Sequence, residues 1–238
     1  MKNVIVSILT LVILISGLLI GCDNVLTGSG NLKTENFPFS DFTQVEVSSA
    51  FEVKITQSDS YSVAVTVDDN LVEYIDVSQE GITLKIGFKT ITMRGPATLK
   101  ATITMPLIHG LYILEASECN ISGFSTTDDI DIKIRQAGKV TGDLKSGNVK
   151  LNLEEASSIQ LDGSANDLIA EVNDASKMNL GNFAVKNAHL SLSDASTGTV
   201  KLDGRLDADL RGASNLFYVG EPTMGTINTL DASKINKK

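Results

Sequence analysis

The chain has 238 residues, which is enough for one domain or two small ones with a buried core. Its 29 acidic and 20 basic side chains give a net charge of -9, a balance that argues against sequence-independent nucleic-acid binding. Two histidines and two cysteines leave little material for a zinc site or a nucleophile–base pair. Composition therefore predicts no catalytic residue, no cofactor and no nucleic-acid partner.

The first 22 residues predict export. Lys2 precedes an uncharged apolar run from Val4 to Ile20, which fits a signal-peptide core or a marginal membrane span. The run ends in Leu19-Ile20-Gly21-Cys22, which resembles the lipobox of bacterial lipoproteins. This resemblance implies that residues 1–21 are a signal peptide and that Cys22 carries the lipid. The alternative is an uncleaved N-terminal helix.

A lipid on Cys22 would determine where the protein resides. Cleavage removes one lysine, so the mature chain is still more acidic and anionic headgroups would repel it. The lipid must then hold the protein to a bacterial membrane, on the cell surface or the periplasmic face. Residues 22–40, which contain Gly28-Ser29-Gly30 and Pro38, are predicted to be a linker.

Residues 41–110 are predicted to be an irregular β region. Apolar side chains alternate with polar ones in several short runs, which is typical of strands with one buried face. These runs contain Val45 and Val47; Val53 and Ile55; Val63, Val65 and Val67; Ile82, Leu84 and Ile86; and Leu99, Ala101, Ile103 and Met105. Asp, Asn, Ser, Gly and Pro clusters between them predict turns.

The second half of the chain contains an internal repeat. An Ala-Ser dipeptide or a close variant recurs at intervals of 21, 19, 19, 20, 18 and 19 residues. The seven marks are Ala116-Ser117, Ala137-Gly138, Ala156-Ser157, Ala175-Ser176, Ala195-Ser196, Ala213-Ser214 and Ala232-Ser233. Spacing this even predicts that each mark occupies the same place in one coil of a repetitive fold.

Apolar residues keep the same distances from five of the seven marks, those from Ala137 to Ala213. Residues three, five and seven positions before these alanines are apolar, as in Ile134, Ile132 and Ile130, and at several marks a second short apolar pair follows the alanine, as in Ile159 and Leu161. The intervening side chains are mostly polar, so each coil is predicted to carry at least two short strands. Glycines often end the second strand and are predicted to form corners.

These patterns predict an all-β solenoid over residues 111–238, continuous with residues 41–110 as one domain. Identical residues would stack in register, with parallel pairing at about 4.8 Å between coils, so that six intervals span about 29 Å. The crossover preference favours right-handed winding. The alanines are predicted to stack in packed corners.

Several segments of the N-terminal half resemble a bacterial protein family. The residues that carry the resemblance are Gly28 to Asn31, Phe42 to Val47, Phe51 to Gln57, Tyr61 to Leu71 and Gly81 to Ile86. They are similar to the putative auto-transporter adhesin head domain, or head GIN domain, and the Ala-Ser coils extend the similarity to about residue 235. The resemblance implies an exported, often lipid-anchored β-helical protein, and it supplies no catalytic residue. The sequence departs at Gln57-Ser58, where members often have Gln-Gly.

The cysteines and histidines have ordinary structural interpretations. Cys119 lies at an inward position and is predicted to be a small buried hydrophobe, rather than a reactive thiol. A lipidated Cys22 could not pair with it in a disulfide. His109 is predicted to occupy an edge or capping position, and His189 to face solvent, because no third histidine or cysteine stands at a metal-ligand spacing.

Acidic residues directly precede most of the repeat alanines, namely Glu115, Glu155, Asp174, Asp194 and Asp231. Stacking would bring neighbouring carboxylates within about 5 Å of one another. Glu155, Asp174 and Asp194 are therefore weak candidates for a calcium ladder. The alternative is a column of solvated edge charges, which is favoured because Gln136 and Gly212 interrupt the column.

Three hypotheses for function follow. The first is a non-enzymatic, adhesin-like surface or envelope protein whose solenoid contacts a glycan or an envelope protein. The second is a structural or stress-related envelope lipoprotein without a discrete ligand. The third is a glycan-acting hydrolase or lyase that uses Asp and Glu on one face of the solenoid, since fold alone does not fix function.

Overall fold

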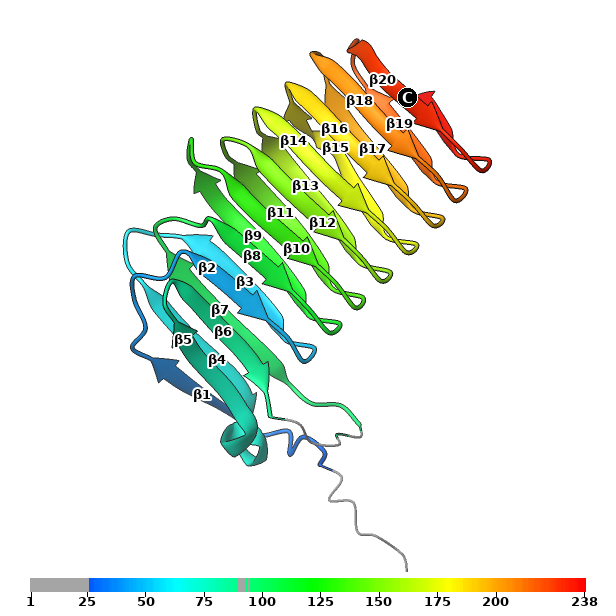
Figure 1. Ribbon diagram of the computed structural model, residues 1–238. Coiled ribbons are helices and arrows are strands. Elements are labelled where there is room, and N and C mark those ends of the chain that lie inside the picture. Colours follow the sequence, from blue (N-terminus) through cyan, green and yellow to red (C-terminus); the bar gives the residue numbers. More distant parts are fainter. Residues whose placement is uncertain (1–25, 90–92, 94) are drawn as a thin grey trace, which may run out of the picture.

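The computed structural model describes residues 26–89, 93 and 95–238. The predicted signal peptide, the lipobox and Cys22 lie outside the described residues, so lipidation stays a prediction. The described chain is an elongated stack of β-strands, and the C-terminus lies at the opposite end of the stack from the first described residues (Figure 1). The expected all-β solenoid is confirmed, with about six turns.

Two long sheets make up the stack. The eleven-stranded sheet contains β1 (Leu32–Phe37), β3 (Glu52–Gln57), β4 (Ser62–Asp68), β7 (Leu99–Met105), β9 (Glu118–Ser125), β11 (Lys139–Lys145), β13 (Ser158–Ser164), β15 (Lys177–Val185), β17 (Thr197–Leu202), β19 (Asn215–Val219) and β21 (Lys234–Lys237). The ten-stranded sheet contains β2 (Gln44–Val47), β5 (Ile75–Glu80), β6 (Thr83–Phe88), β8 (Gly110–Ile113), β10 (Ile130–Ile134), β12 (Val149–Leu153), β14 (Asp167–Val172), β16 (Asn187–Leu192), β18 (Arg205–Leu210) and β20 (Thr223–Thr229).

Each coil contributes one strand to each sheet, and equivalent strands of neighbouring coils pair in parallel. Leu151 of β12 pairs with Ile132 of β10 on one side and with Ala170 of β14 on the other. Equivalent residues therefore stack in register, as the repeat predicts.

The core lies between the two sheets. The inward positions that the sequence pattern identified are buried, among them Ile132, Leu151, Ala170 and Leu190 in the ten-stranded sheet and Ile121, Leu161 and Leu180 in the eleven-stranded sheet. Burying aliphatic side chains at every coil stabilises the stack by roughly 1.5–3 kcal/mol for each large side chain.

The repeat alanines lie in tight turns that join the two sheets. Glu155 and Ala156 both have positive φ, at 59° and 61°, and the equivalent pairs of the other coils share this conformation. Two consecutive residues of this kind between strands form a type I′ turn. The Ala156 N–H donates to the Asp174 carbonyl (2.9 Å), so hydrogen bonding between coils continues through the turn.

The expected packing of the alanines is wrong. Ala116, Ala156 and Ala175 are exposed, whereas the residue after the alanine is buried, as with Ser157 and Ser176. The central residues of a tight reverse turn point away from both sheets, so the alanine faces solvent. The serine directly precedes the next strand and is buried, and the Ser157 hydroxyl donates to the Glu154 carbonyl (2.6 Å).

Strand order at the N-terminal end differs from chain order. β2 lies between β6 and β8, and β3 lies between β7 and β9. The coil made by β2 and β3 is therefore sandwiched between two coils that come later in the chain, and its Ser49–Ala50 turn joins the alanine column. Stacking the strands in the order in which they occur in the sequence would not reproduce this insertion.

The N-terminal end is closed by antiparallel strands. β1 pairs with β4, β4 with β7, and β5 with β6, while a 3₁₀ helix (η1, Asp69–Tyr74) follows β4. The predicted linker, residues 22–40, is thus wrong for Leu32–Phe37, which forms β1. The change to antiparallel pairing ends the coil register and covers the edge strand β7.

The C-terminal end has no such cover among the described residues. β20 and β21 are the last strands of their sheets, and Met224 and Leu230 are large apolar side chains that remain exposed here. Within the described part of the chain, no helix has the length and apolarity needed to span a membrane.

A candidate binding groove on the eleven-stranded sheet

The outer face of the eleven-stranded sheet presents two polar rows that run across the strands. Because successive side chains alternate in direction and the strands stack in register, outward residues of equivalent strands lie side by side. The first row is Lys100, Glu52, Glu118, Lys139, Ser158, Lys177 and Thr197. The second row is Thr102, Lys54, Asn120, Thr141, Gln160, Asn179 and Thr199.

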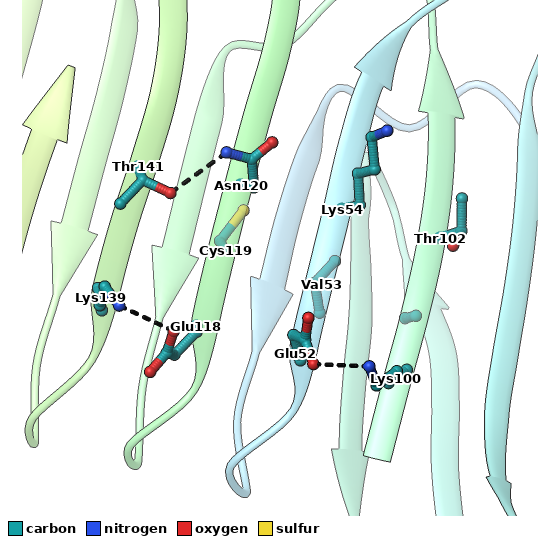
Figure 2. Close-up of a pocket in the computed structure, with 11 residues that line it drawn as sticks. Glu52, Val53, Lys54, Lys100, Thr102, Glu118, Cys119, Asn120, Lys139 and Thr141 are labelled. Carbon is teal, nitrogen blue, oxygen red and sulfur yellow. Dashed lines mark hydrogen bonds and ion pairs between the residues drawn. The ribbon is translucent and has the colours of Figure 1, made fainter. Parts of the chain in front are cut away.

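A hollow of about 350 Å³ lies over β7, β3, β9 and β11 (Figure 2). Two ion pairs flank it in the first row: Lys100 Nζ lies 3.0 Å from Glu52 Oε2, and Lys139 Nζ lies 3.1 Å from Glu118 Oε2. Glu52 and Glu118 are direct neighbours in register. Like charges side by side in a sheet repel, and the flanking lysines offset this repulsion.

The second row supplies uncharged polar groups and one free cation. The Asn120 Nδ2 amide donates to Thr141 Oγ1 at 3.2 Å. Lys54 lies beside Asn120 and Thr102, and its ammonium makes no hydrogen bond or ion pair within the described residues (Figure 2). A free ammonium next to amide and hydroxyl groups is available to an anionic or polar ligand.

A second hollow of about 420 Å³ continues the first. It shares Lys139 and Thr141 with the first hollow and extends over β13, β15 and β17. We call the two together the lysine groove. Its charged lining consists of five lysines and two glutamates, a net charge of +3 on a chain whose net charge is -9; the residues are Lys54, Lys100, Lys139, Lys177, Lys238, Glu52 and Glu118.

The far end of the groove is occupied by Lys238. Its ammonium lies 5.0 Å from the centre of the Phe217 ring, a cation–π geometry, and 3.3 Å from Thr199 Oγ1. The Lys177 ammonium, in contrast, makes no hydrogen bond or ion pair within the described residues. The groove therefore offers two free ammonium groups, Lys54 and Lys177.

Cys119 lies beneath the first hollow and is buried, as its inward position predicts. Burial raises the pKa of its thiol to about 12. The thiol therefore stays protonated near neutral pH, and a thiol without thiolate character is a poor nucleophile. This finding supports the interpretation of Cys119 as a core residue.

The acidic residues of the turns do not form a recognisable metal site. Glu155, Asp174 and Asp194 are exposed at the turn column, and no group of three or more His, Cys, Asp or Glu side chains that could hold a metal ion occurs in the described part of the chain. Glu115 accepts from the Ser49 N–H (3.1 Å) and hydroxyl (3.2 Å), and Asp194 accepts from the Ser193 hydroxyl (2.7 Å). The Glu115 carboxylate thus bonds to the neighbouring turn, and the Asp194 carboxylate to its own turn.

The two histidines are placed differently from one another. His189 is exposed on β16, as predicted. His109 is not at an edge of the stack, because β8, which follows it, lies between β2 and β10. His109 directly precedes β8, and its Nε2 lies 3.4 Å from Asp128 Oδ2. The insertion of the β2–β3 coil is the reason that the predicted edge is internal.

A third hollow, of about 430 Å³, lies on the ten-stranded sheet and has the opposite character. Its charged lining includes Asp129, Asp131 and Asp167 against Lys150. The Asn148 N–H and side-chain amide hold the pKa of Asp129 below its usual range, so that this carboxylate is used within the fold. This hollow and the lysine groove thus differ in the charge of their linings.

Sequence reasoning missed the lysine groove. Its lining comes from strands that are far apart in the chain, such as β3, β7 and β15, and only their register brings the side chains together. The alternation pattern marks Lys54, Lys100, Lys139 and Lys177 as outward residues, and this was the one signal in the sequence. Assembling them into a row needs the order of the strands.

Comparison with known proteins gives the family. The description "Putative auto-transporter adhesin, head GIN domain" applies to the family that matches residues 41–222. The chain belongs to this family. The match confirms the resemblance seen in the sequence, and the family's description points to an adhesin-like binding module and to a protein outside the cytoplasm. No curated protein matches the sequence.

Solved structures share the fold. A "putative adhesin" from Bacteroides fragilis superposes with a TM-score of 0.82 at 22% identity, covering 90% of this chain and 100% of that chain. A "putative adhesin" from Parabacteroides merdae gives 0.70 at 16% identity, with 90% and 98% covered. A "putative lipid binding protein" from Parabacteroides distasonis gives 0.70 at 20% identity, with 90% and 99% covered. Similarity at these identities establishes the architecture of the head GIN chain.

Proposed function

We propose that this head GIN protein is a lipid-anchored, non-enzymatic binding module that contacts a glycan or an envelope protein through the outer face of its eleven-stranded sheet. The observation that carries the proposal is the lysine groove, a continuous polar hollow on a flat, rigid face. The family's description as an adhesin head supports it. Rigid, pre-formed surfaces bind with little loss of conformational entropy.

The groove chemistry supports binding rather than turnover. Its carboxylates, Glu52 and Glu118, are each ion-paired to a lysine, and its cysteine is a buried, protonated thiol. Amides and hydroxyls make up the second row, and these groups donate and accept hydrogen bonds without reacting. Wet, polar contacts of this kind suit a reversible interaction with a hydroxyl-rich partner.

The place where the described chain begins supports a membrane anchor at one end of the stack. Leu26, the first described residue, is four residues after Cys22 and lies at the end closed by β1 and η1 (Figure 1). Four extended residues span at most about 14 Å. A lipid on Cys22 would hold the closed end close to the membrane, while the coils from β8 onward and the groove stay accessible.

The anchor is tested by metabolic labelling with a fatty-acid analogue. Wild-type protein is expected to be labelled and to fractionate with membranes, whereas Cys22→Ser protein is expected to lose both properties. Cys119→Ser is the matched control, because it removes the other cysteine without touching the lipobox. Equal labelling of wild type and the Cys22→Ser variant would overturn the anchored form of the proposal.

Binding is tested with the full-length protein embedded in lipid nanodiscs. The discs are screened against a glycan array and against an envelope-protein extract, with empty discs as the control. Retention of at least one glycan or protein class above the empty discs is expected. Binding to nothing would favour the structural-lipoprotein hypothesis, and shortened glycan products in the eluate, detected by mass spectrometry, would favour the hydrolase or lyase hypothesis.

A further inference from the structure

We infer that the lysine groove takes an extended anionic glycan, a polysaccharide that carries carboxylate or sulfate groups, lying along the axis of the stack. The inference rests on the proposed function and names the ligand class of the same site. Three features of the groove lead to it: its length, its charge and the spacing of its neutral polar groups.

The length fits a polymer rather than a single sugar. The groove runs continuously from β7 to β17, which lie six strand positions apart in the sheet order. At about 4.8 Å for each position, this distance is about 29 Å. The hollow is open along its whole length because both rows stand on the outer face, so a chain can lie in it without threading through an opening.

The charge fits a sparsely charged polyanion. Lys54 and Lys177 are the free ammonium groups, and their strands, β3 and β15, lie four positions apart, or about 19 Å along the groove. Two unpaired cations at this separation suit a polymer with an acidic group on some of its units. Charge-assisted hydrogen bonds from ammonium to carboxylate or sulfate would fix such a chain at two points.

The neutral row fits the remainder of a sugar chain. Asn120, Thr141, Gln160, Asn179 and Thr199 present an amide or hydroxyl at each successive strand. Each group can both donate and accept a hydrogen bond, as sugar hydroxyls do. The periodic spacing of about 4.8 Å provides a partner for one unit of an extended chain after another.

A nucleic acid fits the same groove poorly. Duplex DNA brings one negative charge for each 1.7 Å or so of its axis, and the chain around the groove is acidic. Single strands are generally held by aromatic platforms that stack on the bases. Phe217, which pairs with Thr199 at the far end of the groove, has its ring under the Lys238 ammonium. A glycan with few charges avoids both problems.

The experiment uses the full-length protein in nanodiscs, with partly methyl-esterified polygalacturonate and dextran sulfate of low sulfate content as sparsely charged anionic probes. Neutral dextran is the matched uncharged polymer, and single-stranded DNA is the competing, densely charged polyanion. Both anionic glycans are expected to bind, with affinity rising with oligomer length until the chain spans about 29 Å. Neutral dextran is expected to bind at least about tenfold more weakly, which corresponds to the loss of one or two charged hydrogen bonds. DNA is also expected to bind at least about tenfold more weakly, because its closely spaced phosphates meet a chain with a net charge of -9.

Two double variants locate the site. Lys54→Gln with Lys177→Gln removes the free ammonium groups of the groove and is expected to raise the Kd for dextran sulfate at least about tenfold. Lys150→Gln with Lys186→Gln removes the same charge elsewhere, from exposed residues on the ten-stranded sheet and a connecting corner, and is expected to change the Kd less than about threefold. All four lysines are exposed, so both variants are expected to unfold at the wild-type midpoint.

The outcomes separate this inference from the proposed function. Equal weakening by both double variants, or stronger binding to DNA than to either glycan, would overturn the inference. So would binding of neutral glycans or envelope proteins without the anionic probes, although that result would leave the proposed binding function intact. Binding to no probe and no array member would overturn both.

Discussion

At the scale of single residues, two positions have a narrow structural requirement. One needs a residue without a side chain, and the other needs an ionised carboxylate. Gly142 has a φ of +132°, and a Cβ there would lie 1.8 Å from the Ile121 carbonyl oxygen of the neighbouring coil. Asp68 is buried, and its carboxylate accepts the N–H groups of Gly30 and Thr98, both at 2.7 Å, which lowers its pKa. Such residues join segments that are distant in the chain.

Gly142→Ala is expected to destabilise the protein by about 3 kcal/mol or more, because the methyl group meets backbone and the φ is strained for any L side chain. Gly181→Ala is the matched control, since a Cβ there would meet its nearest atom at an ordinary 3.4 Å. Urea unfolding measures both. Equal free energies of unfolding for the two variants would contradict the geometry at Gly142.

Asp207 provides a pH prediction. Its carboxylate accepts two hydrogen bonds from Arg205 and one from the Thr226 N–H, all at 2.7 Å, and these lower its pKa from 3.8 to about 2. A lowered folded-state pKa contributes stability that is complete above the unfolded-state value and is lost as the pH falls toward 2.

The free energy of unfolding of the wild type is therefore expected to fall between pH 4 and pH 2 more steeply than that of Asp207→Asn, whose amide does not titrate in this range. Denaturant titrations across this window measure the difference between the two curves, which cancels the contributions of the other carboxylates. Parallel curves would show that the Arg205–Asp207 contact contributes no pH-dependent stability.

At the scale of elements, the type I′ turn is the unit that repeats. Its two central residues occupy the left-handed region in every coil, from Ser49–Ala50 to Asp231–Ala232, although alanine is not a residue that favours positive φ. From Ala50 to Ala213, each alanine N–H of these turns donates to a carbonyl of the neighbouring coil, so the turns form a hydrogen-bonded ladder along one side of the stack. The alanines are exposed in this turn, so interior packing is not the reason for the small residue.

Ala175 tests this account of the turn. Ala175→Gly is expected to be neutral or stabilising by up to about 1 kcal/mol, because glycine adopts a φ of 58° without a Cβ penalty. Ala175→Val is expected to cost about 1–2 kcal/mol, since a β-branched residue resists this conformation. His189→Val, at an exposed strand position, is the control and is expected to change the free energy of unfolding by less than about 0.5 kcal/mol. Destabilisation by glycine equal to that by valine would favour a packed corner instead.

At the scale of the whole molecule, the stack is asymmetric. Antiparallel strands close the N-terminal end, whereas β20 and β21 are sheet edges with exposed Met224 and Leu230 nearby. In a solenoid each coil contacts only its neighbours, so stability is roughly a sum of coil and interface terms. The coil at the open end has one interface instead of two.

Native-state hydrogen exchange is expected to show this asymmetry. Amides of β20 and β21 should exchange about tenfold or more faster than those of the central strands β12 to β15, because the terminal coil opens at a lower free energy. Amides of β4 and β7 should exchange like the central strands, since β1 and β3 cover their outer sides. Uniform protection along the stack would mean that the molecule opens only as a whole.

The sequence by itself determined the coil and its interior. The 19-residue recurrence and the period-two alternation place residues such as Ile132, Leu151 and Ala170 inward, because parallel in-register stacking makes the same local pattern repeat at every coil. Cys119 and His189 were placed correctly for the same reason. The strands of the N-terminal region were also apparent, with two exceptions: β1 lies in the segment predicted to be a linker, and no strand was predicted for the residues of β5.

Only the tertiary structure decided which strands are neighbours. The β2–β3 coil sits between coils that follow it in the chain, and antiparallel pairing with β4 turns residues 32–37 into a strand. The lysine groove depends on that order, since Glu52 and Lys54 meet Lys100 on one side and Glu118 on the other only through the inserted coil. Pairing between distant segments is set by the energy of the assembled sheet, which no local pattern of side chains encodes.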